Sequence, residues 1–380
     1  MTTAQRVTIP FNRPSTAKSS VPYVTQALLS GRTSGDGPYT KRCGTYLTTR
    51  LGAPAALLTT SCTDALEMAA LLTRIQPGDE VIVPSFTFSS TAAAFALFGA
   101  TIVFADVRGD TLNINENDLP NLITQKTKAV VVVHYAGVGC EMDTITALCQ
   151  DAGIALVEDN AHGLFGRYRG RNLGSFGVLS TLSFHETKNL SCGEGGALII
   201  NDPSLVDRAE IIREKGTNRS QFWRGQVDKY TWVDHGSSFL PADYVAAALL
   251  AQFEEAEVIQ AKRKALWDRY RRDLTGWATA QNVKLPYVPP DCEQPYHMFY
   301  LRFPSASTME AARQYLVSMG ILAVTHYVPL HSSPQGKRVG RGACPVAEEV
   351  SATLLRLPFY TDMSDEEADT VVAEVTSLTL

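Results

Sequence analysis

The chain has 380 residues, of which 45% are hydrophobic and 19% are charged. Its 34 lysines and arginines stand against 39 aspartates and glutamates, which gives a net charge of −5. This balance argues against nucleic acid as the main partner, because phosphate binding needs concentrated positive charge. The abundance of apolar residues argues against a disordered chain, and the length allows two or three domains.

The spacing of the cysteines and the length of the apolar runs indicate in which cellular compartment the protein works. The seven cysteines are scattered, odd in number and without a C-x-x-C pair, whereas a disulfide framework or a zinc ribbon would space them regularly. Residues 1–15 include Arg6, Asn12 and Arg13 and lack the apolar core of a secretory signal. The longest apolar runs, such as 92–100, are far shorter than the ~20 residues that a membrane span needs. We therefore expect a reduced, cytoplasmic protein with no membrane partner.

Short apolar runs alternate with helical patterns between residues 55 and 200. Strands are predicted at 55–59, 81–83, 101–105, 129–133, 154–157, 178–183 and 197–200. Helices are predicted from Thr63 onward and over residues 92–97. Continuous apolar runs between helices are typical of strands that are buried on both faces of a mainly parallel sheet. The sequence therefore predicts an α/β fold with helices on both sides of the sheet.

The pattern changes after residue 202. Residues 241–273 lack Gly and Pro after their start and predict one long helix or two abutting ones. Strands are expected over 297–303 and 321–327, with helices between and after them. Ser307-x-x-Glu310 and Ser364-x-x-Glu367 are predicted to be capping boxes at two helix starts. We therefore expect a large domain of residues 1–245 and a small α+β C-terminal domain of residues 246–380 that includes the connecting helix.

Two polar segments follow predicted strands and are candidates for chemistry. Asp159 lies in the segment 157–162, at the carboxyl end of a strand, where ligands bind in open α/β sheets. Capping of the next helix is an equally good interpretation of a lone aspartate. Lys188 follows another strand and precedes a glycine-rich turn, and a free amine there can form a Schiff base with a carbonyl. Taken alone, however, most lysines are surface charges.

Two further segments lie upstream. The segment 60–65, which contains Cys62 and Thr63, lies between a strand and a helix, so its amides form an anion site, with helix capping by Thr63 as the other interpretation. Phe88 leaves a strand end and can face a planar ring, although such a phenylalanine is more often core. Together the four segments predict a site for pyridoxal phosphate (PLP). This cofactor has a phosphate, a flat ring, an aldehyde and a ring nitrogen that a carboxylate keeps protonated.

With Asp159, Lys188, Thr63 and Phe88 in this context, the chain resembles the DegT/DnrJ/EryC1/StrS family of sugar aminotransferases over essentially its whole length. The resemblance implies the aspartate aminotransferase-like fold (fold type I) and a homodimer whose active sites are shared between subunits. It implies that Lys188 carries the cofactor covalently, that Asp159 pairs with its ring nitrogen and that Phe88 stacks on its ring. The phosphate would be bound by the backbone amides of Cys62 and Thr63 and by the hydroxyl of Ser183.

Two positions depart from the family pattern. Many relatives have glutamine three residues after the aspartate, near the phenolic oxygen of the cofactor, where this chain has His162. Imidazole can still donate one hydrogen bond, so we expect the role to survive. Many relatives also reach the cofactor phosphate of the partner subunit with an asparagine in a Gly-x-Asn-Tyr-Arg segment. The corresponding segment 236–240 leaves Ser238 as the candidate and contains no arginine.

The resemblance also implies the substrates. Stretches 133–137, 183–189, 213–219 and 225–232 resemble the members of the family that aminate C4 of a dTDP-linked 4-keto-6-deoxyhexose with L-glutamate. A polar loop with Arg219, Arg224, Lys229 and Tyr230 is the candidate for closing over the nucleotide, with a solvated loop as the alternative. Further candidates for the sugar pocket are His185, His326 and Tyr327. The last two, with His331, lack metal-like spacing, so no metal site is expected.

Three alternative functions stay open. An aminotransferase for a 3-keto sugar, or one that gives other stereochemistry at C4, would use the same cofactor residues. A PLP-dependent sugar dehydratase is disfavoured, because those relatives have histidine in place of the lysine that is present here as Lys188. A protein of another class, a catalytically silent one that binds or senses sugar nucleotides, could keep the fold without the chemistry.

Overall fold

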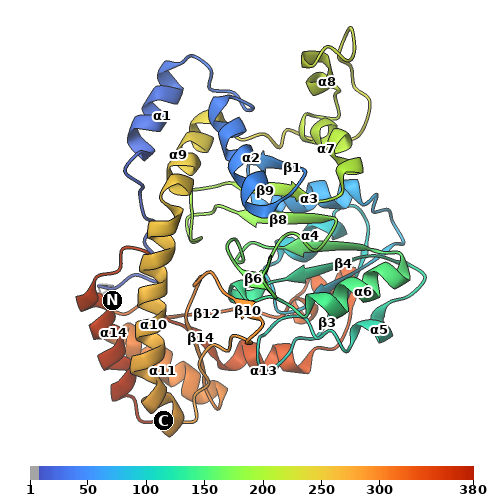
Figure 1. Cartoon of the computed structure of the whole chain (residues 1–380). Helices are drawn as coiled ribbons and strands as arrows, with labels where there is room; N and C mark the ends of the chain where they lie inside the picture. Colours follow the sequence, from blue (N-terminus) through green and yellow to red (C-terminus); the bar gives the residue numbers. More distant parts are fainter. Residues whose placement is uncertain (1–7) are drawn as a thin grey trace, which may run out of the picture.

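The structure, a computed structural model, describes residues 8–380 and contains one eight-stranded and two three-stranded sheets (Figure 1). Two predictions, the absence of a secretory signal and the start of the large domain, fall partly on residues 1–7, which lie outside the described residues. The strand order of the large sheet is β1 (Ala55–Thr59), β9 (Gly196–Ile200), β8 (Leu179–Ser183), β5 (Ala155–Asp159), β4 (Thr127–Val133), β2 (Glu80–Pro84), β3 (Thr101–Ala105) and β13 (Gly340–Arg341).

The large sheet is mainly parallel. Strands β8, β5, β4, β2, β3 and β13 run in one direction, and only β9 is antiparallel to both of its neighbours, β8 and β1. Val130, Val131 and Val132 in β4 have no exposed surface, because both faces of this strand are covered. Burial on both faces explains the continuous apolar runs in the sequence. The predicted α/β class with a mainly parallel sheet is confirmed.

Helices cover both faces of this sheet, since neighbouring side chains of a strand point to opposite sides. Val131 packs in the core with α3 (Cys62–Leu72) and α4 (Ser90–Ala96), whereas Val130 and Val132 pack with α6 (Met142–Ala152). Over β8 and β9 the cover is α2 (Pro38–Leu51) and α9 (Asp243–Glu254). The remaining helices of this part are α1 (Ser20–Leu29), α5 (Leu119–Leu122), η1 (Tyr135–Gly137), η2 (Pro203–Leu205), α7 (Val206–Arg213) and α8 (Arg219–Trp223).

The C-terminal part has its own core, which includes Tyr270, Phe299 and Leu355. The predicted helical stretch is two abutting helices, because α9 ends at Glu254 and α10 (Ala256–Ala280) begins after Glu255. The small sheet has the order β11 (Tyr300–Arg302), β14 (Leu354–Arg356), β12 (Val324–Thr325), with shorter outer strands than predicted. The other elements of this part are α11 (Ala306–Ser318), η3 (Leu330–Ser332), α12 (Gly336–Val339), α13 (Pro345–Thr353) and α14 (Asp365–Ser377). Its strand β10 (Cys292–Glu293) forms a small sheet with two strands of the large part, β6 (Arg167–Tyr168) and β7 (Arg171–Asn172).

Three segments cross between the predicted domains, and one of them is β10, which pairs with β6. Strand β13 comes from the C-terminal part but extends the large sheet beside β3. Ile9, near the other end of the chain, forms a bridge with Ile321 and lies in the C-terminal core. The division at residue 245 stays a prediction, and these three segments are exceptions to it. No helix within residues 8–380 is long and apolar enough to cross a membrane.

One of the two predicted capping boxes is correct. Ser364 accepts from the amide of Glu367, whose carboxylate accepts from the amide of Ser364. The prediction at Ser307 is wrong, because α11 begins two residues earlier and its box joins Ser305 and Thr308. Ser307 fits the Ser-x-x-Glu pattern, but the N-cap of α11 is Ser305, which has an extended backbone and accepts from the amide of Thr308.

Candidate active site

A cavity of about 650 Å³ lies where β4, β5 and β8 end, and the C-terminal part closes its other side. Open α/β sheets bind ligands at this edge. Four predicted site residues, Arg219, Lys229, Tyr230 and Ser238, do not line the cavity. The ten that do are Cys62, Thr63, Phe88, Asp159, His162, Ser183, His185, Lys188, His326 and Tyr327.

The N-terminus of α3 forms one end of the cavity. Ser61 is the N-cap and accepts from the amide of Asp64, so the alternative interpretation, capping by Thr63, is wrong. The Thr63 hydroxyl instead contacts that of Ser90 at 2.8 Å. The first amides of a helix have no partner within it, and the macrodipole adds positive potential there. A side chain on Gly196 would meet the backbone of Ser61 and Cys62 at 2.3–2.4 Å, so glycine is what lets β9 approach this end. The result is an anion cradle of backbone amides.

Asp159, the last residue of β5, presents a carboxylate to the cavity. Its Oδ2 accepts from the hydroxyl of Thr91 at 2.7 Å and its Oδ1 from the amide of Ala161 at 3.3 Å. Burial raises the pKa of Asp159, although both hydrogen bonds and the nearby Lys188 act in the opposite direction. A carboxylate in this position is stabilised further when a cation is brought beside it.

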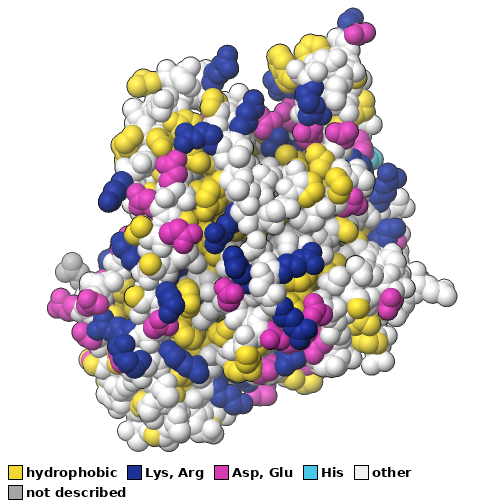
Figure 2. Space-filling model, viewed as in Figure 1, with side chains coloured by type: hydrophobic (Ala, Val, Ile, Leu, Met, Phe, Trp, Pro, Cys, Tyr) yellow, Lys and Arg dark blue, Asp and Glu magenta, His cyan; other side chains and the backbone are white. Residues whose placement is uncertain are grey.

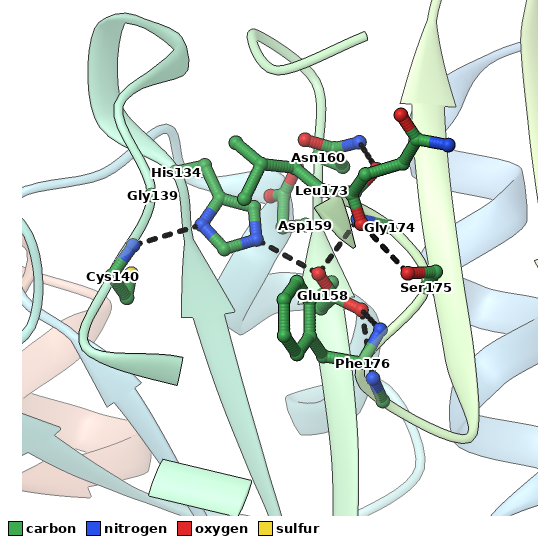
Figure 3. A network of polar contacts seen from close by, with 12 residues as sticks. His134, Gly139, Cys140, Glu158, Asp159, Asn160, Leu173, Gly174, Ser175 and Phe176 are labelled. Atoms are coloured by element: carbon green, nitrogen blue, oxygen red, sulfur yellow. Dashed lines mark hydrogen bonds and ion pairs between the residues drawn. The ribbon is translucent and has the colours of Figure 1, made fainter. Parts of the chain in front are cut away.

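The preceding residue, Glu158, points to the opposite face of the strand and is enclosed (Figure 3). Its two oxygens accept from the amides of Gly174, Phe176 and Gly177 at 2.6–2.7 Å and from Nε2 of His134 at 2.9 Å. Nδ1 of His134 accepts from the amide of Cys140, which assigns the ring hydrogen to Nε2. Glu158 thus ties the loop between β7 and β8 to the end of β5.

Lys188 lies in the turn after β8, where its amide donates to the carbonyl of His185. Burial lowers the pKa of the Lys188 amine to about 8, with an additional lowering by Arg356, while Cys62 and Asp159 raise it. An amine with this pKa has a substantial neutral fraction near neutral pH and is therefore a nucleophile and a base.

Three histidines stack on one side of the cavity. The ring centroids of His162 and His297 are 4.4 Å apart, and those of His162 and His326 are 6.4 Å apart. Burial is the main reason that the pKa of each ring lies well below its ordinary value, so all three are neutral near pH 7. Among the described residues, Nδ1 of His162 is buried without a hydrogen-bond partner. This atom is free to bond a ligand, as the resemblance predicts for His162.

The remaining predicted residues, some for the cofactor and some for the substrate, divide into two groups. Phe88 lines the cavity with 60% of its surface exposed, and its ring centroid is 6.3 Å from that of Tyr327. Tyr327 in turn packs on His326, with centroids 3.5 Å apart. His185 lies at the cavity wall, where its Nδ1 contacts the hydroxyl of Thr187 at 2.9 Å.

The second group lies on a segment of residues 214–238, which we call the arm. The arm leaves α7, includes α8 and projects from the large sheet (Figure 1). Bridges between Glu214 and Ser238 and between Thr217 and Trp232 hold its base together. Arg219, Lys229, Tyr230 and Ser238 are all exposed on it. In the single chain these residues lie away from the cavity, so the arm does not close over it there.

Sequence reasoning missed several cavity residues. Arg356 and His297 line the cavity from the C-terminal part, and Thr91 holds Asp159 in place. Arg356 sits at the end of a three-residue strand, and no local motif marks it. One signal was available in the sequence: Arg356 directly follows two leucines of an apolar stretch. Arginines are rarely buried without a partner, so an arginine in such a stretch indicates a ligand or an ion pair.

The residues present fit PLP. The amides of α3 suit its phosphate, the carboxylate of Asp159 suits a protonated ring nitrogen, and the amine of Lys188 suits an aldehyde. The buried, unpartnered Nδ1 of His162 is a further polar atom that such a ligand satisfies. The fold and this set of groups define an enzyme of the fold type I, PLP-binding class.

Comparison with known proteins identifies the group within this class. The chain belongs to the DegT/DnrJ/EryC1/StrS aminotransferase family, whose pattern matches residues 14–376. It is 32% identical over 378 residues to the spore coat polysaccharide biosynthesis protein SpsC of Bacillus subtilis, covering 97% of this chain and 96% of that one. The aminotransferase TlmJ from Streptoalloteichus hindustanus superimposes with a TM-score of 0.89 at 30% identity, covering 97% and 98% of the two chains.

A second solved structure bears on the cofactor. The putative sugar aminotransferase Spr1654 from Streptococcus pneumoniae has been solved with PLP and with PMP. Both structures superimpose with a TM-score of 0.89 at 26% identity over 97% of this chain. The match covers 98% of the Spr1654 chain in the PLP form and 97% in the PMP form. These likenesses confirm the predicted fold class and the family.

Proposed function

We propose that this PLP-dependent aminotransferase moves the amino group of L-glutamate to C4 of dTDP-4-keto-6-deoxy-D-glucose, giving dTDP-4-amino-4,6-dideoxygalactose for a surface polysaccharide. One observation carries the aminotransferase chemistry: the Lys188 amine, with its pKa lowered to about 8, shares one cavity with Asp159 and the α3 amides. The finer choice of sugar is supported by four stretches of sequence and by the polysaccharide role in the name of SpsC.

The cofactor is PLP, and this chain's residues would hold it at both ends. Amides of Cys62 and Thr63, with the Ser183 hydroxyl, would bind the phosphate, and Phe88 would cover the ring. Asp159, oriented by Thr91 and Ala161, would hold a proton on the ring nitrogen. Bound in this way, PLP supplies an aldehyde for the amino group and a ring that accepts electrons from the reacting carbon.

Lys188 is the residue that moves protons. In the donor half, its Nζ takes the proton from Cα of glutamate and delivers one to the carbon that receives the nitrogen; in the sugar half, the same transfers run in reverse at C4. A single amine can serve both halves because its pKa lies near the operating pH. Neutral His162, His297 and His326 add no positive charge that would oppose the lysine.

The sugar side of the proposal uses the other wall of the cavity. His326, Tyr327 and His185 surround the space that a keto-sugar would occupy. The seven cysteines are free thiols, which suits the reduced cytoplasm where we propose that the enzyme works.

The proposed enzyme is a homodimer with shared active sites. The arm residues Arg219, Lys229, Tyr230 and Ser238 lie off their own cavity, which supports a role for them at the cavity of a second copy. The arm also exposes Trp223 at 70% and Trp232 at 75% of their surfaces, which is unusual for a free monomer surface. Figure 2 shows hydrophobic side chains on the surface of the projecting part that contains α8 in Figure 1. We propose that the arm delivers these residues to the nucleotide diphosphate and the cofactor phosphate of the partner site.

The function is tested by incubating the protein with L-glutamate and dTDP-4-keto-6-deoxyglucose and determining the product by NMR. We expect an amino group at C4 in the axial, galacto configuration. Amination at C3 or an equatorial C4 product would overturn the sugar assignment and keep the enzyme class. Lys188→Ala should give no product, and a protein that binds the sugar nucleotide without any turnover would support the silent-binder alternative.

Shared sites are tested by subunit complementation. Lys188→Ala and the double variant Arg219→Ala, Lys229→Ala should each be inactive or severely impaired alone. In hybrid dimers formed on mixing, one of the two sites has both an intact lysine and an intact arm, so activity should return toward a quarter of the wild-type level. If the mixture stays as inactive as its components, the arm does not act on a partner site.

A further inference from the structure

We propose that Arg356 binds the α-carboxylate of the amino-acid donor and is thereby the residue that selects an α-amino acid for the first half of the reaction. This inference rests on the proposed function, since it concerns the donor of that same site. It assigns a role to a residue that no sequence motif marks.

The placement of Arg356 is rigid. It ends β14, the central strand of the small sheet, and pairs with Tyr300 on one side and Val324 on the other. Leu355 faces the C-terminal core, so Leu354 and Arg356 point to the opposite face, toward the large domain. Arg356 there lines the cavity, and its guanidinium lies 4.5 Å from the ring centroid of Phe11.

The guanidinium has no anionic partner in the described part of the chain. Nη1 donates to Nε2 of His326 at 3.1 Å, and Nδ1 of that ring donates to the hydroxyl oxygen of Tyr135 at 3.0 Å. Nε of Arg356 is buried and makes no hydrogen bond within residues 8–380. An unpaired, partly desolvated cation is costly, and both the neutral imidazole and the aromatic ring leave its charge uncompensated. The site is therefore prepared for an anion that arrives with a ligand.

The position relative to Lys188 indicates which anion. Lys188 and Arg356 are the only lysine and arginine that line the cavity in the described chain. Arg356 lies close enough to lower the pKa of the Lys188 amine. The cofactor phosphate has its own cradle at α3, at another end of the cavity. Of the donor's groups, the α-carboxylate is one bond from the carbon that Lys188 deprotonates, so it is the anion that must lie beside both residues.

The test compares two donors that differ only in this carboxylate. 4-Aminobutyrate is glutamate without its α-carboxylate, and it keeps the γ-carboxylate. In single turnovers of the holoenzyme, we measure the rate at which each donor removes the absorption band of the bound cofactor. Arg356→Gln should slow the reaction with glutamate by about 10- to 100-fold and leave that with 4-aminobutyrate within about twofold. Arg356→Lys should restore part of the glutamate rate, because it keeps the charge without the planar fork.

A binding measurement gives a readout that is independent of turnover. Glutarate, which has both carboxylates and no amine, should bind to Arg356→Gln about tenfold more weakly than to the wild-type holoenzyme in calorimetry. The matched control is Arg302→Gln on the neighbouring strand β11, whose arginine binds Gly109 and Glu349 away from the cavity. It should lower stability and leave the ratio of the two donor rates unchanged.

The possible outcomes separate the two proposals. Equal losses with glutamate and 4-aminobutyrate would overturn the carboxylate assignment, and so would a loss confined to the KM for the sugar nucleotide, which would place the diphosphate at Arg356. If the wild-type protein fails to react with any α-amino acid, the proposed aminotransferase function itself is overturned.

Discussion

The two faces of β5 carry adjacent carboxylates with opposite surroundings. On the cavity face, Asp159 accepts two hydrogen bonds, from Thr91 and Ala161, and has spare acceptor capacity beside Lys188. On the opposite face, Glu158 accepts four, from three amides and His134, and is fully enclosed (Figure 3). An acidic group with spare capacity in a cavity can still bind something, whereas a saturated one can only hold the protein together.

Asp159→Asn should have the larger effect on chemistry. The amide keeps the shape and both local partners in reach but cannot hold a positive ring nitrogen, so the rate of the donor half-reaction should fall by about 10²- to 10³-fold. Stability should change little, because burial disfavours the charged form of this carboxyl, as its raised pKa indicates, so removal of the charge costs little. The check is the single-turnover loss of the cofactor band, with Thr91→Val as a milder control. A rate within tenfold of wild type would mean that Asp159 does not have the chemical role that distinguishes it here from Glu158.

Glu158→Gln should do the reverse. The new NH2 group must face at least one of the amides of Gly174, Phe176 or Gly177, or the ring N–H of His134, so one buried donor loses its acceptor. The expected cost is about 3 kcal/mol of unfolding free energy, measured in urea. At a temperature where the variant is folded, turnover should stay near that of wild type. A variant as stable as wild type but as slow as Asp159→Asn would reverse the roles of the two faces.

The pH dependence of Lys188 sharpens the description of the cavity face. A lysine reacts as the neutral amine, which predominates above its pKa, and here burial and Arg356 bring this value down to about 8 from the ordinary 10.5. The rate at which apoprotein captures PLP should therefore rise about tenfold per pH unit up to about pH 8 and then level off. Absorbance of the bound cofactor against pH measures this. A rise that continues beyond pH 10 would mean that the amine is not desolvated.

Sequence patterns predicted one wall of the cavity better than the other. Cys62, Asp159 and Lys188 each follow an apolar strand, and parallel strands that end at one edge bring such residues together. Arg356 comes from the short antiparallel strand β14, and His297 comes from the irregular segment just before β11. The positions of both residues depend on packing between the two parts of the chain, which local pattern does not encode. The arm shows the same limit, since the residues expected at the cavity lie off it in a single chain.

The smallest predicted effect also comes from comparing two residues of one type, here a serine that caps a helix and a serine that does not. Ser305 accepts from the amide of Thr308 and caps α11, whereas Ser307, which with Glu310 fits the capping-box pattern in the sequence, lies inside the first turn. Glu310 is instead bound by Arg313 and Gln314. Ser305→Ala should cost about 1 kcal/mol of unfolding free energy and Ser307→Ala less than about 0.5 kcal/mol. Urea unfolding of both variants decides this: the reverse order would mean that α11 begins at the box that the sequence predicts, and that the backbone entering this helix follows another course.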